Sequence, residues 1–171
     1  MPGLTADQII KLLGLEPLPE EGGLFRQTYR SAEEIPAVAL PSRYGAPRRI
    51  ATAIYYLLTA DRDSFSALHR LKTDEVYHFY LGDPVEMLLL HPEGAGERVV
   101  LGQDLAAGQK VQLVVPTGAW QGSRLRPGGR FALLGTTMAP GYEEEDFELG
   151  GREALLRDYP DQAELIRGLT R

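Results

Sequence analysis

Two segments of the chain carry the side chains best suited to chemistry. One runs from His69 to Gly82 with the sequence HRLKTDEVYHFYLG, and the other from Gly108 to Gln121 with the sequence GQKVQLVVPTGAWQ. Histidine has an ordinary pKa near neutrality, and a carboxylate beside it can orient the ring and stabilise the imidazolium. The pattern predicts His69 as a general base, Glu75 as its orienting partner and Tyr77 as an acid or hydrogen-bond donor. Such a trio suits removal of a proton next to a carbonyl group.

Strand alternation predicts how these groups come together. Alternate residues of a strand share a face, so one face is expected to hold Phe65, Ala67, His69 and Leu71. The next strand is expected to present Glu75, Tyr77 and Phe79 together. The intervening LKTD predicts a turn, so His69 and Glu75 are expected to meet across a hairpin. His78 falls on the opposite face, where it packs outside the barrel or at a subunit interface.

The remaining patterning predicts a mainly β domain flanked by helices. Thr5 and Gln8 have the spacing of a capping box, and the apolar repeat that follows ends at Gly14. Turn residues separate the short strand signals LFRQTY, IATAIYYLL, FSALHRL, EVYHFYL, PVEMLLLHP, ERVVLG, KVQLVVP and RFALLGTTM. Residues 33–48 hold three prolines and are expected to form a loop. Two helical patterns divided by Pro160 end the chain. One antiparallel sandwich or barrel over residues 1–171 is therefore expected.

The two segments together resemble the motifs of the cupin superfamily. His69, Glu75 and Gly82 stand where the first motif has its first His, its Glu and its closing Gly. Pro116 and Gly118 match the Pro-x-Gly of the second motif. With GGLFRQTYRS, TAIYYLL and APGYEEEDFEL, the chain is similar to a small cupin subfamily of uncharacterised function, related in fold to dTDP-4-dehydrorhamnose 3,5-epimerase. The resemblance implies a double-stranded β-helix, that is, a jelly-roll barrel, and a homodimer.

The resemblance also raises the question of a metal. Cupins that bind transition metals use three imidazoles and a carboxylate, but Leu71 replaces the second His and Gln121 stands in the place of the third. One reading is therefore an isomerase or epimerase acting on a carbohydrate-like or nucleotide-sugar ligand without a metal. The alternatives are an oxygenase-type enzyme with Mn, Fe, Ni or Zn on His69, Glu75 and Gln121, and a barrel that binds or stores a ligand without catalysis.

Other polar and aromatic residues are candidates for ligand contacts. Trp120 and Gln121 end the Pro-x-Gly turn, where they are expected to wall a pocket. Arg26 and Tyr29 are expected at the barrel mouth, and one of Tyr55 and Tyr56 must face the lumen. The acids of GYEEEDFEL are expected to form a solvated face rather than a cation site.

Composition narrows the classes of partner. The chain has 171 residues, a formal charge of −6 and no cysteine, so disulfides, thiolate metal sites and cysteine nucleophiles are excluded. The charge argues against a nucleic acid or an anionic membrane surface, which leaves a small organic ligand as the expected partner. The N-terminal residues lack the pattern of a signal peptide, and a cytoplasmic protein is expected.

Overall fold

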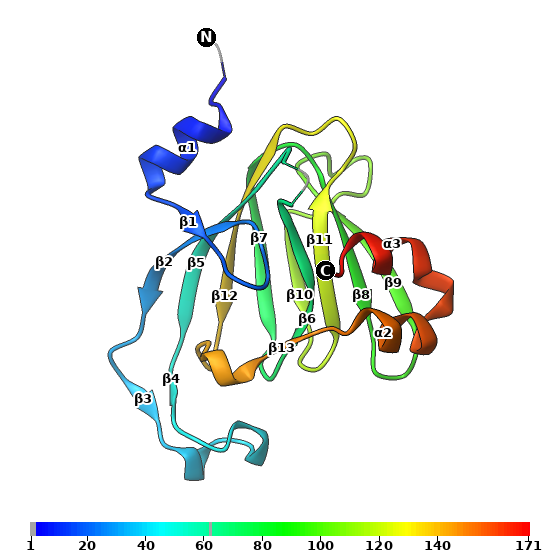
Figure 1. Cartoon of the computed structure of the whole chain (residues 1–171). Helices are drawn as coiled ribbons and strands as arrows, with labels where there is room; N and C mark the ends of the chain where they lie inside the picture. Colours follow the sequence, from blue (N-terminus) through cyan, green and yellow to red (C-terminus); the bar gives the residue numbers. More distant parts are fainter. Residues whose placement is uncertain (1–2, 62) are drawn as a thin grey trace.

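Two antiparallel sheets face each other to form a barrel (Figure 1). The computed structural model describes residues 3–61 and 63–171. The first sheet has the order β1 (Glu16–Pro17), β2 (Leu24–Arg30), β5 (Thr52–Thr59), β12 (Phe131–Met138), β7 (Glu75–Gly82) and β10 (Gln112–Val115). The second sheet has the order β13 (Phe147–Leu149), β6 (Phe65–Leu71), β11 (Trp120–Leu125), β8 (Val85–Leu90) and β9 (Gly96–Leu101). This arrangement confirms the predicted jelly roll.

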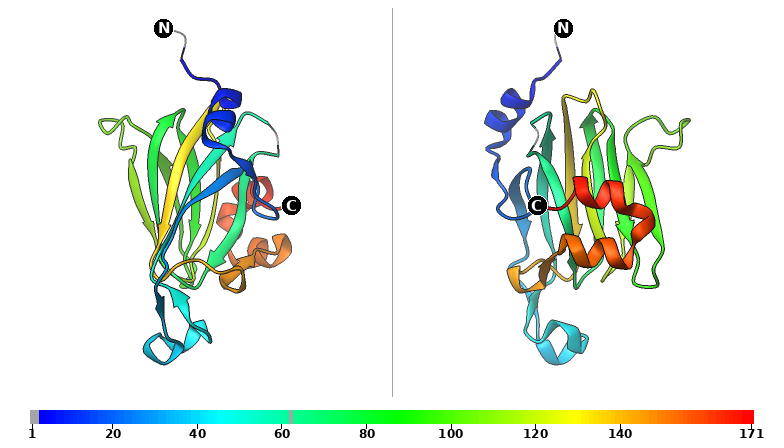
Figure 2. Two further views of the ribbon diagram at one scale, coloured as in Figure 1. Left: turned by 90° about the vertical axis from the view of Figure 1, so that its left-hand side faces the viewer. Right: turned by 45° about the vertical axis from the view of Figure 1, so that its right-hand side comes forward.

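Helices close the outer sides of the barrel. Helix α1 (Ala6–Leu13) has the predicted capping box of Thr5 and Gln8, and Gly14 ends it in the left-handed conformation. Helices α2 (Arg152–Asp158) and α3 (Ala163–Gly168) lie across the second sheet (Figure 2). The predicted helices at both ends are therefore confirmed. No helix within the described ranges is both long and apolar enough to cross a bilayer.

The core has three apolar clusters, one between the sheets and one beneath each set of helices. The cluster between the sheets includes Tyr56, Tyr77, Phe79, Met87 and Leu134. A second cluster joins Leu68 and Leu88 of the second sheet to Leu165 and Ile166 of α3. The third joins Ile9 of α1 to Leu57 and Phe131 of the first sheet. The cluster between the sheets fills the interior beneath β8, β9 and β10, and the polar side chains of the interior lie beside it on β6, β7 and β12.

The connection between β6 and β7 differs from the predicted hairpin. The two strands belong to different sheets, so residues 72–74 carry the chain across the barrel from one sheet to the other. His69 pairs in register with Gln121 of β11, while Glu75 pairs with Val115 and Met138. His69 and Glu75 still come together, because the inner faces of the two sheets look at each other.

A bulge in β6 changes part of the predicted alternation. The register moves from Gln121–His69 to Ser123–Ser66, so β6 has one residue more than β11 over this stretch. Phe65 therefore packs with the outer cluster beneath α2 and α3, on the side opposite His69. Strict alternation had placed Phe65 and His69 on the same face.

The sequence signals also missed one long strand. Strand β11 begins at Trp120 and contains Gly122, Ser123 and Arg124, which are poor strand formers, yet it lies in the middle of its sheet. Gly122 packs tightly there, since a Cβ at this position would lie 3.0 Å from the Leu68 Cγ atom. Strand β13 was missed too, because the run of acids before it suggested a loop.

An arm of the chain extends from one end of the barrel (Figure 1). It covers the region expected to be a loop, and it contains the short strands β3 (Glu34–Ile35) and β4 (Arg48–Arg49) and two 3-10 helices, Ala37–Ala39 and Ser42–Tyr44. Arg48 at its base is buried and forms two hydrogen bonds of 2.7 and 2.8 Å with the buried carboxylate of Asp146. This ion pair fastens the arm to the 3-10 helix Glu144–Asp146, which precedes β13.

Candidate functional site

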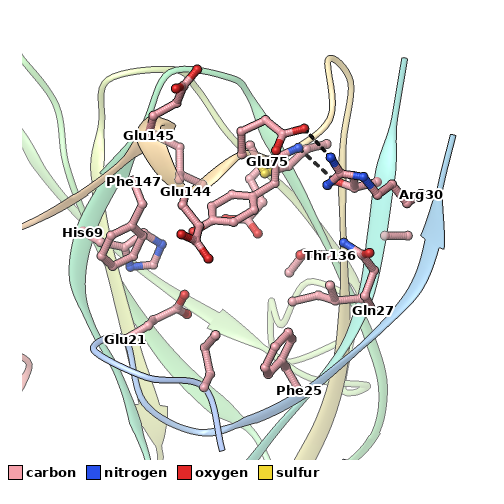
Figure 3. Close-up of a pocket in the computed structure, with 18 of the residues that line it drawn as sticks. Glu21, Phe25, Gln27, Arg30, His69, Glu75, Thr136, Glu144, Glu145 and Phe147 are labelled. Carbon is pink, nitrogen blue, oxygen red and sulfur yellow. Dashed lines mark hydrogen bonds and ion pairs between the residues drawn. The ribbon is translucent and has the colours of Figure 1, made fainter. Parts of the chain in front are cut away.

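A cavity of about 1190 Å³ opens between the two sheets at the side of β2 and β13 (Figure 3). The inner faces of both sheets form its floor, and the β1–β2 loop and the 3-10 helix Glu144–Asp146 form its rim. Its apolar wall includes Phe25, Ile54, Leu71, Met138 and Phe147, and its polar wall includes Gln27, His69, Glu75, Thr136 and Tyr142. The volume suits a small organic ligand.

His69 lines this cavity, and two contacts hold its ring. The side chain is buried, and the ring stacks on Phe147 with 5.1 Å between centroids. Its Nδ1 atom lies 2.8 Å from the backbone oxygen of Ala67. A carbonyl oxygen can only accept, so Nδ1 carries the hydrogen in the neutral ring and Nε2 has the lone pair. The arrangement fixes one tautomer and leaves Nε2 as the basic nitrogen of the ring.

Glu75 lies on the same cavity and is held by Gln121. The Nε2 atom of Gln121 donates a hydrogen bond of 2.8 Å to Glu75 Oε2. Burial raises the pKa of the Glu75 carboxyl above its ordinary value, while the charge of His69 acts in the opposite direction. The carbonyl oxygen of Gln121 is buried and has no hydrogen-bond partner within the described residues. A buried acceptor is thus left unsatisfied beside the carboxylate.

Tyr77 lies deeper than sequence reasoning suggested. Its side chain belongs to the apolar cluster between the sheets, beneath the cavity, and it is not among the lining residues. Burial raises the pKa of its hydroxyl well above the ordinary value, and the charge of Glu75 raises it further. Tyr77 therefore keeps its proton and acts on Glu75 rather than on a ligand directly.

None of the five predicted ligand contacts is among the lining residues. Gln121 meets the cavity only through its hydrogen bond to Glu75, and the other four lie outside it. Trp120 packs against the outer cluster beneath the C-terminal helices and lies under the guanidinium of Arg70. Tyr55 points outward towards α1 and Tyr80, so its neighbour Tyr56 is the tyrosine that faces the lumen. Arg26 donates to the Leu13 backbone oxygen at the end of α1, and Tyr29 is exposed. The strand faces explain these placements, because each residue sits on the outward face of its strand.

His78 has the predicted outward position. It stacks on Tyr80 and lies near Gln112 and Thr137, on the face of β7 opposite Glu75. It therefore cannot add a second imidazole to the site.

Several cavity residues gave no recognisable signal in the sequence. Phe25, Gln27 and Arg30 of β2 line the cavity (Figure 3). Their neighbours Arg26 and Tyr29, which were predicted as ligand contacts, do not. Glu21 reaches the cavity because the β1–β2 loop is bound to the barrel, where Tyr56 donates to the backbone oxygen of Gly22 at 2.9 Å. Gly22 has φ +98°, which only glycine adopts readily, and its missing Cβ leaves room for the backbone of Phe65.

The acidic run is largely exposed, as expected for a solvated face, and part of it also borders the cavity. Glu143, Glu144 and Glu145 line the cavity rim, and Asp146 is buried against Arg48. Tyr142 lines the cavity as well, and burial together with the charges of Glu21 and Glu144 raises the pKa of its hydroxyl to about 12. The Arg48–Asp146 pair holds this segment against the barrel and so brings its acids to the cavity rim. The local sequence does not reveal such a long-range contact.

The donors in the cavity do not match the transition-metal site found in many cupins. Leu71 offers an apolar side chain, and Gln121 turns its amide nitrogen, which cannot bind a metal, towards Glu75. Across residues 3–61 and 63–171, no group of three His, Cys, Asp or Glu side chains has the arrangement of a metal site. The prediction of Mn, Fe, Ni or Zn on His69, Glu75 and Gln121 stays a prediction.

Comparisons with known proteins agree with this fold. Residues 7–150 match the protein family described as Cupin superfamily (DUF985). The chain is 30% identical over 135 residues to the uncharacterized protein YML079W of Saccharomyces cerevisiae, and the match covers 74% of this chain and 66% of the yeast protein, just under two thirds of its length.

Two solved structures are similar over nearly the whole chain. Protein SO0799 from Shewanella oneidensis is 37% identical with a TM-score of 0.84, and the match covers 99% of both chains. A hypothetical protein from Leishmania major is 30% identical with a TM-score of 0.86, covering 98% of this chain and 99% of that one. The descriptions of these relatives name no ligand or reaction.

Proposed function

The chain belongs to the cupin superfamily, in the DUF985 family, and we propose that it binds a carbohydrate-like small molecule and moves a proton next to its carbonyl group. The reaction class is isomerisation or epimerisation. One observation carries the proposal: the hydrogen bond between His69 Nδ1 and the Ala67 backbone oxygen leaves Nε2 as the basic nitrogen of a ring that lines the cavity.

The neighbours of His69 support its role as a base. When His69 takes a proton it becomes positive, and the carboxylate of Glu75 stabilises that charge. Gln121 fixes Glu75 through its amide hydrogen bond, and Tyr77 lies beside Glu75 as a positioning residue. Burial of all four groups limits the water around the new charge, which strengthens the electrostatic effect.

A proton donor is also needed, because isomerisation removes one proton and returns one. Tyr142 lines the same cavity as His69, and its raised pKa of about 12 keeps the hydroxyl protonated at neutral pH. We assign Tyr142 as the donor to the carbon or oxygen that gains a proton, in place of Tyr77, which does not reach the cavity.

The mixed wall of the cavity supports a carbohydrate-like ligand. A sugar has apolar ring faces and a belt of hydroxyl groups, and the cavity offers Phe25, Ile54 and Met138 beside Gln27 and Thr136. The cavity volume leaves room for a ligand larger than one sugar ring.

Solvent exchange tests the proposal without knowledge of the product. Neutral keto and aldo sugars that raise the thermal stability of the protein are incubated with it in D2O, and NMR follows deuterium entry at the carbon next to the carbonyl. We expect exchange with the wild type, loss of exchange in His69→Gln with binding retained, and unchanged exchange in the control His78→Gln. A bound sugar that never exchanges would overturn the catalytic part and leave a binding barrel.

A further inference from the structure

The described walls of the cavity carry many more acids than bases. They include the glutamates Glu16, Glu20, Glu21, Glu75, Glu143, Glu144 and Glu145, against the arginines Arg30 and Arg48. Seven carboxylates thus face two guanidinium groups, an imbalance that affects any ligand entering between the sheets.

Both arginines already have acidic partners. Arg30 pairs with Glu143 at 2.7 Å. Arg48 pairs with Asp146 and with Glu145, each at 2.7 Å, and its side chain is 1% exposed. Their positive charges are therefore compensated, and neither guanidinium is available to bind the phosphate or carboxylate of a ligand.

Two of the remaining carboxylates reach the cavity beside His69. Figure 3 shows Glu21 and Glu144 directed at the same space as the His69 ring, one from the β1–β2 loop and the other from the 3-10 helix of the rim. Neither glutamate has an ion-pair partner within residues 3–61 and 63–171. Glu21 accepts one hydrogen bond, from the hydroxyl of Ser66 at 2.8 Å.

A second, independent feature of the site also requires a donor. The carbonyl oxygen of Gln121, a residue 1% exposed, is buried without a hydrogen-bond partner, next to the carboxylate of Glu75. A buried acceptor without a donor is costly, and a ligand that brings N–H or O–H groups relieves that cost. Gln121 itself is not among the lining residues of the cavity, but its unsatisfied oxygen belongs to the amide that holds Glu75, which does line it.

We propose that the ligand is a small hydroxylated amine, such as an amino sugar, whose ammonium group lies between Glu21 and Glu144. The negative charge that surrounds Tyr142 and contributes to its high pKa attracts a cation in the same way. The same charge repels sugar nucleotides and other anions, which disfavours a nucleotide-sugar ligand. The inference rests on the proposed function, because it names the substrate class of the site that contains His69.

Three sugars that differ mainly in charge test the proposal by calorimetry: glucosamine, glucose and glucuronate. We expect glucosamine to bind about tenfold more tightly than glucose at low salt, and its advantage to shrink as salt is added. Glucuronate is expected to bind more weakly than glucose. Equal affinities for the three sugars, the reverse order, or no binding of glucosamine at millimolar concentrations would overturn the proposal.

Matched variants locate the charge effect. The double variant Glu21→Gln with Glu144→Gln is expected to lose about tenfold in glucosamine affinity and little in glucose affinity. The control double variant Glu153→Gln with Glu164→Gln removes the same charge from exposed positions on α2 and α3 and is expected to change neither. An equal loss in both double variants would assign the preference to overall charge and overturn the site.

This test is separate from that of the proposed function. Charge preference is read from binding alone, in the wild type and in His69→Gln, whereas the proton transfer is read from deuterium exchange. Preference for glucosamine without exchange would support the ligand class and reject the reaction. Exchange of neutral sugars without any charge preference would support the reaction and reject the ligand class.

Discussion

The ion pair between Arg48 and Asp146 should be one of the most consequential polar contacts for stability. Asp146 has a side chain that is 0% exposed and Arg48 one that is 1% exposed. Besides the two bonds to Asp146, the guanidinium donates to the backbone oxygens of Tyr44, Ala46 and Pro47. Substituting Asp146→Ala leaves this cation buried, with only the exposed Glu145 and the three carbonyl groups around it.

The expected loss follows from the difference between buried and exposed pairs. Removing one partner of a buried pair costs about 3 to 5 kcal/mol, because the other charge stays desolvated. For a chain of this length, such a loss lowers Tm by about 6 to 20 °C. The matched control is Glu148→Ala, which breaks the two hydrogen bonds from Arg70 in a pair with side chains 42% and 55% exposed. Its loss should be about 0 to 1 kcal/mol.

Urea unfolding measures both variants, with the fluorescence of Trp120, the single tryptophan of the chain, as the signal. The variant Asp146→Asn separates charge from shape and should lose nearly as much as Asp146→Ala. If Asp146→Ala loses no more than Glu148→Ala, the pair does not hold the arm to the rim, and the reasoning is refuted.

Three further predictions concern the site and the assembly. Burial raises the pKa of Glu75, so the folded state binds the proton of this carboxyl more tightly than the unfolded chain does. Above the ordinary pKa of a glutamate, the ionised carboxylate therefore reduces the stability of the fold. Glu75→Gln should therefore be more stable than the wild type at neutral pH, with a difference that shrinks as the pH falls towards that ordinary value; a difference in urea midpoints independent of pH would contradict this. Protein purified without chelators should contain far less than one equivalent of Mn, Fe, Ni or Zn by elemental analysis, and a full equivalent that His69→Gln removes would support the metal alternative. Strand β1 pairs with β2 only at Leu24 and Phe25, which leaves the edge of β2 from Arg26 to Arg30 for pairing with a second copy of the chain. Light scattering should therefore give twice the mass of one chain.

The sequence was most informative where local rules decide the structure. The capping box at Thr5 and the helix stop at Gly14 depend on a few neighbouring residues, and both were correct. Alternation along β7 was correct as well, since Glu75, Tyr77 and Phe79 all point inward. His69 and Glu75 were found because their spacing matches a known motif, although the connection between their strands was not the expected hairpin.

Features that depend on distant contacts could not be read in the same way. The bulge that turns Phe65 outward is set by the pairing of β6 with β11, and no local pattern marks it. Tyr55 and Tyr56 are adjacent and chemically alike, so only the packing of α1 against the outer side of β5 decides which faces the lumen. The acids after Tyr142 resemble an ordinary surface segment until the buried pair of Arg48 and Asp146 draws them to the cavity rim.

This division explains why the motif points to the proposed base, His69, but not to the ligand. The motif residues come from the inner sheet faces, where pairing register fixes His69 beside Gln121 and Glu75 opposite them. The other carboxylates beside His69 that have no ion-pair partner among the described residues are Glu21 and Glu144. They lie on two connections that the barrel does not specify and that are held by Tyr56 and Arg48. Relatives with the same barrel can therefore keep the proposed base, His69, and carry side chains of the opposite charge at the cavity rim. We expect ligand class to follow the residues at positions 21 and 144 more closely than it follows the motif.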